Sequence, residues 1–431
     1  MRILLLVFCA AVTAATRPLI AQDTLGREPV SLLQVLDSVA ARYPTLEAAR
    51  ARIRAARGSR STAGTLGNPI LMYEVDNAPL PGRPAPPMDR ELMLTATLPL
   101  EPLYQRWSRV SGANAEVRAA EADAQAERQR TGQDATHAFY RMARAQVALA
   151  AARDLAAWLD SVVAYNRTRV QEGVAAEADL IRSELERDRA EADATMQEAD
   201  LARARADVSV FLGDELVPFR VAALDAPLAL PEVSLASQAG TTRPDIRAAR
   251  ERVVAAGAGV TTERTSLIRQ LGLTVGTKRS AGTTSLIAGV SMPFPLFDQN
   301  RGAIARAAAD REAATFDLAA QERIGRAEIV GASEAARLLT ERARALVGAA
   351  PGQGYLARAD EARRIALGAY QEGAVPLIQV IDAARAWGEA RLTYHEILYA
   401  QHESVVQLLV AEGVDIASAL PALTIDAEAR P

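Results

Sequence analysis

The chain has 431 residues and is close to neutral, with 49 Lys and Arg against 53 Asp and Glu. This balance excludes a typical nucleic-acid-binding protein, which carries an excess of basic residues. Aromatic residues make up only 4% of the chain, too few for a conventional globular core of this length. Ala, Arg, Glu and Leu dominate instead, a composition typical of long, close-packed helices.

The N-terminus has the pattern of a secretory signal peptide over residues 1–21. Arg2 is followed by an apolar run and then by small residues, which predicts cleavage before Gln22. The apolar run is too short to span a bilayer. Cys9 is the only cysteine and lies in this leader, so the predicted mature chain has no disulfide and no cysteine-ligated metal. A lipoprotein leader anchored through Cys9 is the less favoured alternative, because Phe8 stands where a small residue is expected.

A short Gln-Glu-Gly sequence occurs twice, at 171–173 and at 371–373. Pro44 and the helical pattern after it have a counterpart at Pro244, and the offset between the copies is again 200 positions. Two independent matches at one offset predict an internal duplication. Each Gln-Glu-Gly sequence lies between two helical patterns. Because glycine is unfavourable inside a helix and favourable at its end, each copy predicts the tip of a helical hairpin.

The first repeat, residues 22–213, combines short helices, a strand pair and a long helical hairpin. Apolar and polar residues alternate on both sides of a proline-rich loop, which predicts a β-hairpin with one apolar and one polar face. Prolines end this hairpin, because proline cannot donate to a strand ladder, and helical sequence follows. The expected elements are a helix from Ser31 to about Ala41, strands at about 70–77 and 91–99, and helices at about 103–170 and 174–212.

The second repeat, residues 243–413, follows the same plan after a proline-marked linker at 214–242. Glycines between Gly348 and Gly354 interrupt its outward helix and mark either a kink or a small side insertion. The tail, residues 414–431, is apolar and then acidic, and its end is expected to be poorly ordered. The expected elements are strands at about 270–279 and 284–292 and helices at about 298–372 and 376–412.

Each predicted strand has about 8–10 residues, the length that crosses a bilayer obliquely. An ordinary sheet with one face in solvent gives the same alternation, so both interpretations stay open at this point. Four strands cannot close a barrel, and an open strand edge cannot exist in lipid. A membrane sheet therefore requires several chains to share one barrel, with eight strands from two chains or twelve from three.

The leader, the duplication, the strand pairs that end in proline and the helical tips together resemble the TolC-like outer-membrane efflux proteins, over roughly residues 30–413. The tips are the most specific part of this resemblance: Gly173 precedes Asp179-Leu180, and Gly373 precedes Asp382. The resemblance implies a mainly α fold with a membrane β-barrel part. Three chains would build a twelve-stranded barrel in the outer membrane and a periplasmic α-helical tunnel.

The resemblance also implies a function and a set of partners. The chain would be the outer-membrane channel subunit of a tripartite efflux system, a passive gated exit duct from the periplasm to the exterior. It would be no enzyme and would need no cofactor, because no catalytic motif occurs and transport energy would come from a partner. The partners would be two sister chains, a periplasmic adaptor protein, an inner-membrane pump of the resistance-nodulation-division type and outer-membrane lipid, with no nucleic acid.

Family gate positions fall on the hairpin tips. Asp382 matches the inner position of an acidic ring that selects cations, whereas Gln379 stands at the outer acidic position, which puts a two-tier gate in doubt. Tyr370 matches a tyrosine that helps to hold the closed state, but Val375 replaces its usual arginine partner, which puts that latch in doubt. Asp179 matches the acidic tip residue of the first copy. The residues expected to contact the adaptor are Glu172, Gly173, Glu372 and Gly373.

The resemblance assigns no role to the histidines and tryptophans, which are the remaining candidates for binding residues. His395 and His402 are seven residues apart and share a helix face, but a metal site would need a third ligand, so packing is favoured and no metal site is predicted. The three tryptophans are expected to be packing or interface residues rather than substrate platforms; they are Trp107, Trp158 and Trp387.

A short motif at the first predicted strand bears on which cargo the duct would carry. Asn68-Pro69 followed by Glu74 to Asn77 resembles the first strand of the heavy-metal-cation branch of the family, so metal cations or small toxic compounds are expected. Drugs, organic solvents and secreted polypeptides are alternatives. A periplasmic coiled-coil adaptor or a structural scaffold would also have long helical hairpins. The adaptor would need a lipoyl-like β-domain, and the scaffold would lack the paired strands.

Overall fold

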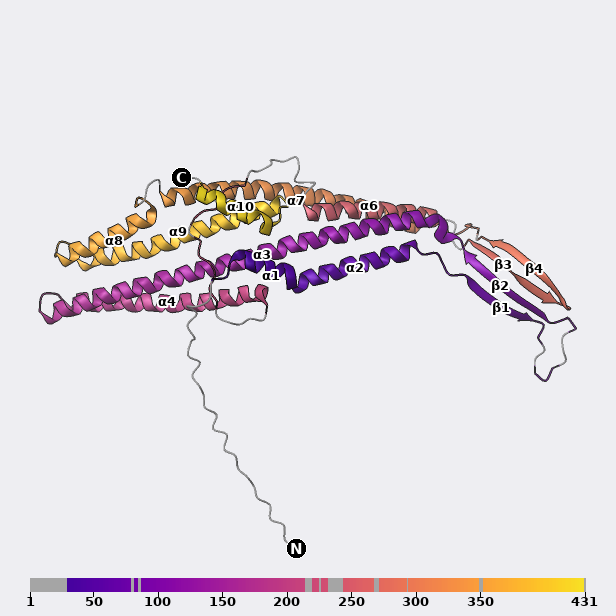
Figure 1. Ribbon diagram of the computed structural model, residues 1–431, viewed down its shortest axis with the longest axis horizontal. Coiled ribbons are helices and arrows are strands. Elements are labelled where there is room, and N and C mark those ends of the chain that lie inside the picture. Colours follow the sequence, from indigo (N-terminus) through magenta and orange to yellow (C-terminus); the bar gives the residue numbers. More distant parts are fainter. Residues whose placement is uncertain are drawn as a thin grey trace, which may run out of the picture.

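The computed structural model describes residues 29–78, 81–83, 87–213, 219–224, 226–231, 243–266, 271–292, 294–348 and 352–429. The predicted leader, including Cys9, lies outside the described residues, as does most of the linker. The described chain is elongated: helices run side by side along one long axis, a sheet lies at one end, and two helical hairpins end together at the other (Figure 1). None of the helices in the described ranges is both long enough and apolar enough to cross a membrane.

The helices are continuous over long stretches because their sequences contain few residues that break a helix. The longest, α3, has 71 residues, which corresponds to about 105 Å. Both α2 and α6 begin with proline at their first position, where the missing N–H costs nothing. The helices are α1 (Leu32–Arg42), α2 (Pro44–Gly64), α3 (Glu101–Gln171), α4 (Glu177–Leu212), α6 (Pro244–Thr265), α7 (Arg301–Val347), α8 (Tyr355–Gln371), α9 (Leu377–Ala411) and α10 (Ile416–Ala429).

Four antiparallel strands form one sheet in the order β1-β2-β3-β4. The hairpins of the two repeats join through β2 and β3, where Thr95 faces Gly276. Within the described residues, β1 and β4 have no further strand beside them. The strands are β1 (Ile70–Asp76), β2 (Glu91–Pro99), β3 (Gly272–Ser280) and β4 (Thr283–Ser291).

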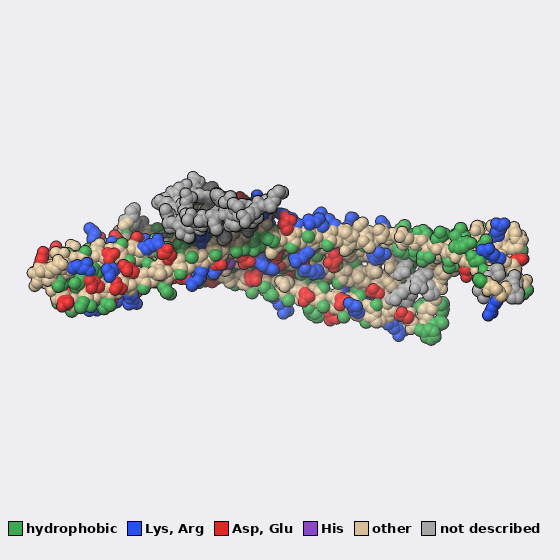
Figure 2. Space-filling model, turned by 90° about the horizontal axis from the view of Figure 1, so that it is seen from below, with side chains coloured by type: hydrophobic (Ala, Val, Ile, Leu, Met, Phe, Trp, Pro, Cys, Tyr) green, Lys and Arg blue, Asp and Glu red, His purple; other side chains and the backbone are tan. Residues whose placement is uncertain are grey.

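One face of this sheet is apolar and exposed. The register places Tyr73 beside Leu94 and Val275 beside both Ala96 and Ala288, so each of the four strands contributes apolar residues to the same side. Leu286 and Leu71 are more than 70% exposed. Hydrophobic side chains gather near this end of the molecule, whereas charges of both signs cover the helices (Figure 2). Within the described part of the chain, therefore, nothing covers the apolar face.

Like the sheet, the helices form a layer that is open at both edges. Near the strands, α3 packs between α2 and α6, and α6 packs on α7. Toward the tips, α3 packs between α4 and α9, and α9 packs on α8. Each half of the layer thus contains four neighbouring helices. The layer does not close on itself (Figure 1).

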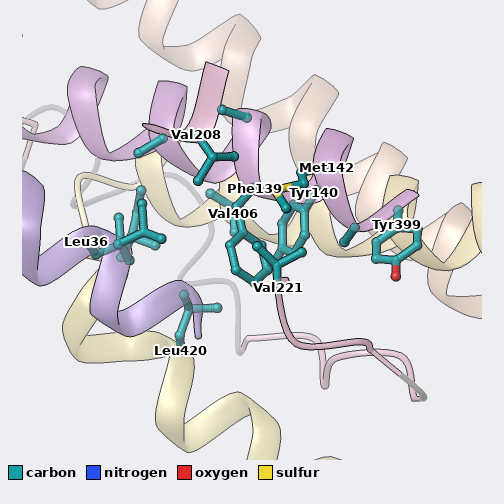
Figure 3. Packing of buried hydrophobic residues seen from close by; sticks show 14 of the residues in the cluster. Leu36, Phe139, Tyr140, Met142, Val208, Val221, Tyr399, Val406 and Leu420 are labelled. Atoms are coloured by element: carbon teal, nitrogen blue, oxygen red, sulfur yellow. The ribbon is translucent and has the colours of Figure 1, made fainter. Parts of the chain in front are cut away.

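The main hydrophobic core lies at the middle of the rod. Phe139, Tyr140 and Met142 of α3 are buried together with side chains from α1, α4, α9 and α10 (Figure 3). Val30 and Val221 form a parallel bridge, which brings the chain before α1 beside the linker. The short elements at the middle of the rod thus hold the long helices together.

Two glutamines attach the linker to the helices. Gln146 of α3 donates to the carbonyl of Val221 at 3.1 Å and accepts its N–H at 2.9 Å. Gln401 of α9 makes the same pair of bonds with Leu228, each 3.0 Å long, and donates to Thr340 at 3.0 Å. Each amide side chain thus pairs with both the N–H and the C=O of one linker residue, as a neighbouring strand would.

One sequence expectation needs correction. The outward helix expected at about 298–372 is divided into α7 and α8, because Gly348 adopts a φ of +86° and ends α7. In the tail, α10 extends over Ile416–Ala429, and the last two residues, where poor order was expected, lie outside the described residues. The first part of α10 is anchored by the burial of Ile416 and Leu420 in the main core.

His402 makes the core sensitive to acid. Its side chain is 2% exposed, its Nε2 donates to the carbonyl of Ala226 at 2.9 Å, and burial lowers its pKa to about 4. The unfolded chain binds this proton near pH 6.5, so stability should fall as the pH drops from about 6.5 to about 4, by about 1.4 kcal/mol per unit.

His137 opposes this effect, because its contact with Glu403 raises its pKa. We therefore expect the difference between the pH–stability profiles of wild type and His402→Gln to isolate the contribution of His402. Chemical unfolding in detergent at pH 4.5 to 7.5 measures both profiles. Parallel profiles over this range would contradict the assignment.

Candidate functional site

The two hairpin tips have the same backbone structure. At the first tip, Gly173 adopts a φ of +72°, its N–H donates to the carbonyl of Val170, and the N–H of Val174 donates to that of Arg169. Gly373, with a φ of +76°, has the equivalent pair of bonds. This is the Schellman arrangement, which satisfies the last carbonyls of a helix and requires a left-handed residue. The duplicated glycines therefore turn the chain at both tips.

The adaptor-contact residues predicted from the sequence lie on open surface. Glu172, Gly173, Glu372 and Gly373 are all exposed. A methyl group added at either glycine would meet no atom within 4 Å. Nothing in the described chain covers the tips, which leaves them accessible to a partner.

Tyr370 is fixed between the two hairpins. Its hydroxyl donates to Oδ1 of Asn166 on α3 at 2.7 Å, and its ring meets that of Tyr165 edge-on at 6.0 Å. The guanidinium of Arg169 lies 5.4 Å from the Tyr370 ring. Burial, together with the charge of Asp179, raises the pKa of Tyr370, so its hydroxyl stays a donor. We call Tyr165, Asn166, Arg169 and Tyr370 the tip cluster.

The tip cluster supplies what the sequence interpretation missed. Val375 packs at the edge of this apolar group, and an arginine reaches Tyr370 from α3 instead of from the tip of its own hairpin. Arg169 and Asn166 precede Gly173 by about one and two helical turns, so the sequence does indicate how far along α3 each lies from the tip. Their proximity to Tyr370 depends on how the hairpins pack and could not.

Asp382 and Gln379 do not belong to the tip cluster. Both are exposed on the first turns of α9, and the structure shows no ion pair or side-chain hydrogen bond for either among the described residues. Asp179 is half-exposed in the first turn of α4. The structure thus brings Asp179 near Tyr370 and leaves the Asp382 carboxylate facing outward from the protomer.

Metal ligation is not supported by the histidines in this chain. His402 is in the main core, and His137 faces Glu403 with 3.5 Å between Nδ1 and Oε1. His395 stacks on Tyr399, with ring centroids 6.2 Å apart. Across the described residues there is no group of three or more His, Cys, Asp and Glu side chains arranged to hold a metal ion.

Residues 235–414, which contain the whole second repeat, match the model of the family described as outer membrane efflux protein. This match supports the resemblance of the second repeat to the TolC-like outer-membrane efflux proteins. No curated protein sequence matches the chain. The family match supports a transport role in the outer membrane rather than catalysis.

Solved structures show the same fold over nearly the whole chain. The outer-membrane channel OprN is 21% identical, with a TM-score of 0.76 and 90% of each chain covered. CusC, whose structures concern folding and transmembrane channel formation, is 17% identical, with a TM-score of 0.75 and 93% of this chain and 98% of that chain covered. The Campylobacter jejuni outer membrane channel CmeC is 15% identical, with a TM-score of 0.73 and coverages of 92% and 89%.

Removal of the Tyr370 hydroxyl tests the tip cluster. Tyr370→Phe leaves the fully buried Asn166 without this hydrogen bond, so we expect a loss of about 1–2 kcal/mol and faster amide hydrogen exchange over residues 366–373. Tyr165→Phe is the control, because the Tyr165 hydroxyl has no hydrogen bond within the described part of the chain. Equal exchange rates in the two variants would contradict the role of Tyr370.

Proposed function

We propose that the chain is one subunit of a homotrimeric exit duct that carries solutes from the periplasm to the exterior. In this duct, three four-stranded sheets complete a twelve-stranded barrel in the outer membrane, and three helical layers complete a periplasmic tunnel. The observation that carries the proposal is the open sheet with an exposed apolar face. Such a face fits lipid, and its two unpaired edges must then be paired by sister chains.

The edges of the layer fit a closed ring of chains. One side of the molecule ends in β1, α2 and α4, and the other ends in β4, α7 and α8. If each side pairs with the opposite side of the next copy, the long axes of all copies stay parallel, and such head-to-tail contacts can close into a ring. Outer-membrane channels of the same fold support a ring of this kind.

The tips would form the gated end of the duct. An adaptor protein that leads to an inner-membrane pump would contact Glu172, Gly173, Glu372 and Gly373, which nothing covers in the monomer. Opening would require the α8–α9 hairpin to move away from α3, since the tip cluster joins these elements. The duct itself would be passive, with transport energy supplied by the pump.

Cargo selection would begin at the tip carboxylates. Three copies of Asp382 around one axis would favour cations over anions, with Gln379 and Asp179 tuning the same entrance. We propose metal cations or small toxic compounds as the cargo class, on the basis of the motif from Asn68 to Asn77.

Reversal potentials test the role of Asp382. In planar bilayers with a KCl gradient, we expect Asp382→Asn to lower the cation-to-anion permeability ratio at least threefold without changing the mass of the complex. Asp317→Asn is the control, because Asp317 is exposed on the half of α7 nearer the strands. A ratio that stays at the wild-type value would remove Asp382 from the gate.

Membrane fractionation tests the proposed function itself. The native protein should be found in the outer membrane and should run as a trimer in SDS that dissociates on heating. A soluble periplasmic monomer would overturn the proposal and would favour an adaptor or scaffold instead.

A further inference from the structure

Two tryptophans and two arginines meet between the helical hairpins, away from the tip cluster. Trp158 and Trp387 lie about 15 residues from their tips, which corresponds to about 20 Å along a helix. The guanidinium of Arg363 on α8 lies 4.4 Å from the ring of Trp387 on α9 and 5.4 Å from that of Trp158 on α3. Arg391 lies 5.1 Å from the Trp387 ring and donates to Asp154 of α3 at 2.6 Å. We call these five residues the tryptophan–arginine stack.

Arg363 is held by aromatic faces more than by hydrogen bonds. Its side chain is 20% exposed and donates to Asp360 on its own helix at 2.8 Å. Its Nε is buried and has no hydrogen-bond partner within the described residues. A partly desolvated guanidinium gains more from a tryptophan face than an exposed one does. Arg363 is therefore specifically placed between two rings that come from different hairpins.

The neighbouring arginine shows that this arrangement is not a general property of α8. Arg364 has a side chain that is 73% exposed, and its ion pair is with Glu361 one turn earlier on the same helix. It makes no cation–π contact in the described structure. Of these two neighbouring arginines, only Arg363 reaches a side chain of α3 in the described structure.

We propose that the tryptophan–arginine stack is a second fastening that holds the α8–α9 hairpin against α3 when the duct is closed. This inference rests on the proposed function. Two contacts of the stack cross the boundary that must open: Arg363 to Trp158, and Arg391 to Asp154. Both arginines also contact Trp387, so this ring couples the two crossings. The residues act by positioning the gate, and the stack has no part in binding the solute.

The test measures gating directly in the reconstituted full-length mature protein. We expect Arg363→Met and Trp387→Leu to raise the mean single-channel open probability about fivefold or more in planar bilayers, the size expected for loss of a desolvated cation–π contact. Arg363→Lys keeps a cation and Trp387→Phe keeps an aromatic face. These variants should therefore show less than half of this increase in open probability. Arg364→Met is the matched control and should behave as wild type.

A second readout does not require a pore. Spin labels at Glu172→Cys and Glu372→Cys, in labelled chains diluted with unlabelled chains, report the distance between the two tips in detergent. We expect Arg363→Met to lengthen and broaden this distance distribution and Arg364→Met to leave it unchanged. If Arg363→Met matches Arg364→Met in both readouts, the stack is no fastening. If wild type forms no pore but the distances change as expected, the proposed function fails while the fastening stands.

Discussion

Replacement of Gln401 by leucine should cost about 4 kcal/mol of stability. Its side chain is fully buried and joins α9 to the linker and to α7 through three hydrogen bonds, each 3.0 Å long. Leucine has a similar volume but leaves the backbone groups of Leu228 and the hydroxyl of Thr340 without these bonds. Each buried polar group left unpaired costs about 1–3 kcal/mol.

The control for this change is on the same helix. Gln407 is exposed, and no hydrogen bond of its side chain is found in the described structure. Gln407→Leu should therefore alter stability by less than about 0.5 kcal/mol. Urea unfolding of the detergent-solubilised protein, followed by circular dichroism, measures both variants. Similar midpoints for the two variants would show that the linker does not depend on Gln401.

Gly276→Val should prevent correct pairing of the two β-hairpins. A Cβ at this position would lie 2.3 Å from the carbonyl oxygen of Leu94 and 2.7 Å from Cα of Thr95. These are backbone atoms of β2, so the strands must separate to make room. Overpacking of this kind costs about 1–3 kcal/mol, and here it falls on the contact that joins the two repeats. We expect a loss of most heat-modifiable trimer in the outer membrane.

Gly289→Val separates this steric effect from the loss of a glycine. Gly289 also lies inside a strand, but a Cβ there would have no atom within 4 Å. Valine favours extended backbone, so this variant should assemble at least as well as wild type. Quantitative immunoblots of unheated outer-membrane fractions compare the two variants. Equal trimer yields would contradict the close packing of β2 on β3.

The features that the sequence predicted best are those that local chemistry decides. Glycines at 173 and 373 occupy left-handed positions that other residues rarely adopt, so the tips could be found from composition alone. The apolar alternation of the strands is a period-two pattern that the observed register repeats. The helix expected from Ser31 is likewise decided locally, because Ser31 caps α1 in a capping box with Gln34.

The features that the sequence could not predict depend on contacts between distant segments. The break between α7 and α8 brings Gly354 against the end of α7, where a Cβ would lie 2.4 Å from the carbonyl oxygen of Val347. The positions of the glycines in the sequence do not show that two backbone segments come this close. The helix at 416–429 forms where apolar tail residues reach a core built by six other helices and the linker. Partners of Tyr370 and Arg363 come from α3, about 200 residues earlier in the chain.

The duplication accounts for the plan of the molecule, and the departures from it account for the candidate gate. Tyr370 and Arg363 are on the second hairpin, and both bind side chains on α3 of the first. The second outward helix is divided, whereas the first is continuous over 71 residues. The second hairpin thus carries the separate helical segment and the cross-hairpin contacts, as expected of a moving part held against a rigid one.

The central claim is that sister chains complete the open sheet and helical layer into a membrane channel. The most direct test is to purify the native protein in detergent, determine the number of chains per particle by multi-angle light scattering, and insert the same sample into planar bilayers. The account predicts three chains per particle and discrete ionic conductance steps. A monodisperse monomer that remains soluble without detergent and gives no conductance would contradict it.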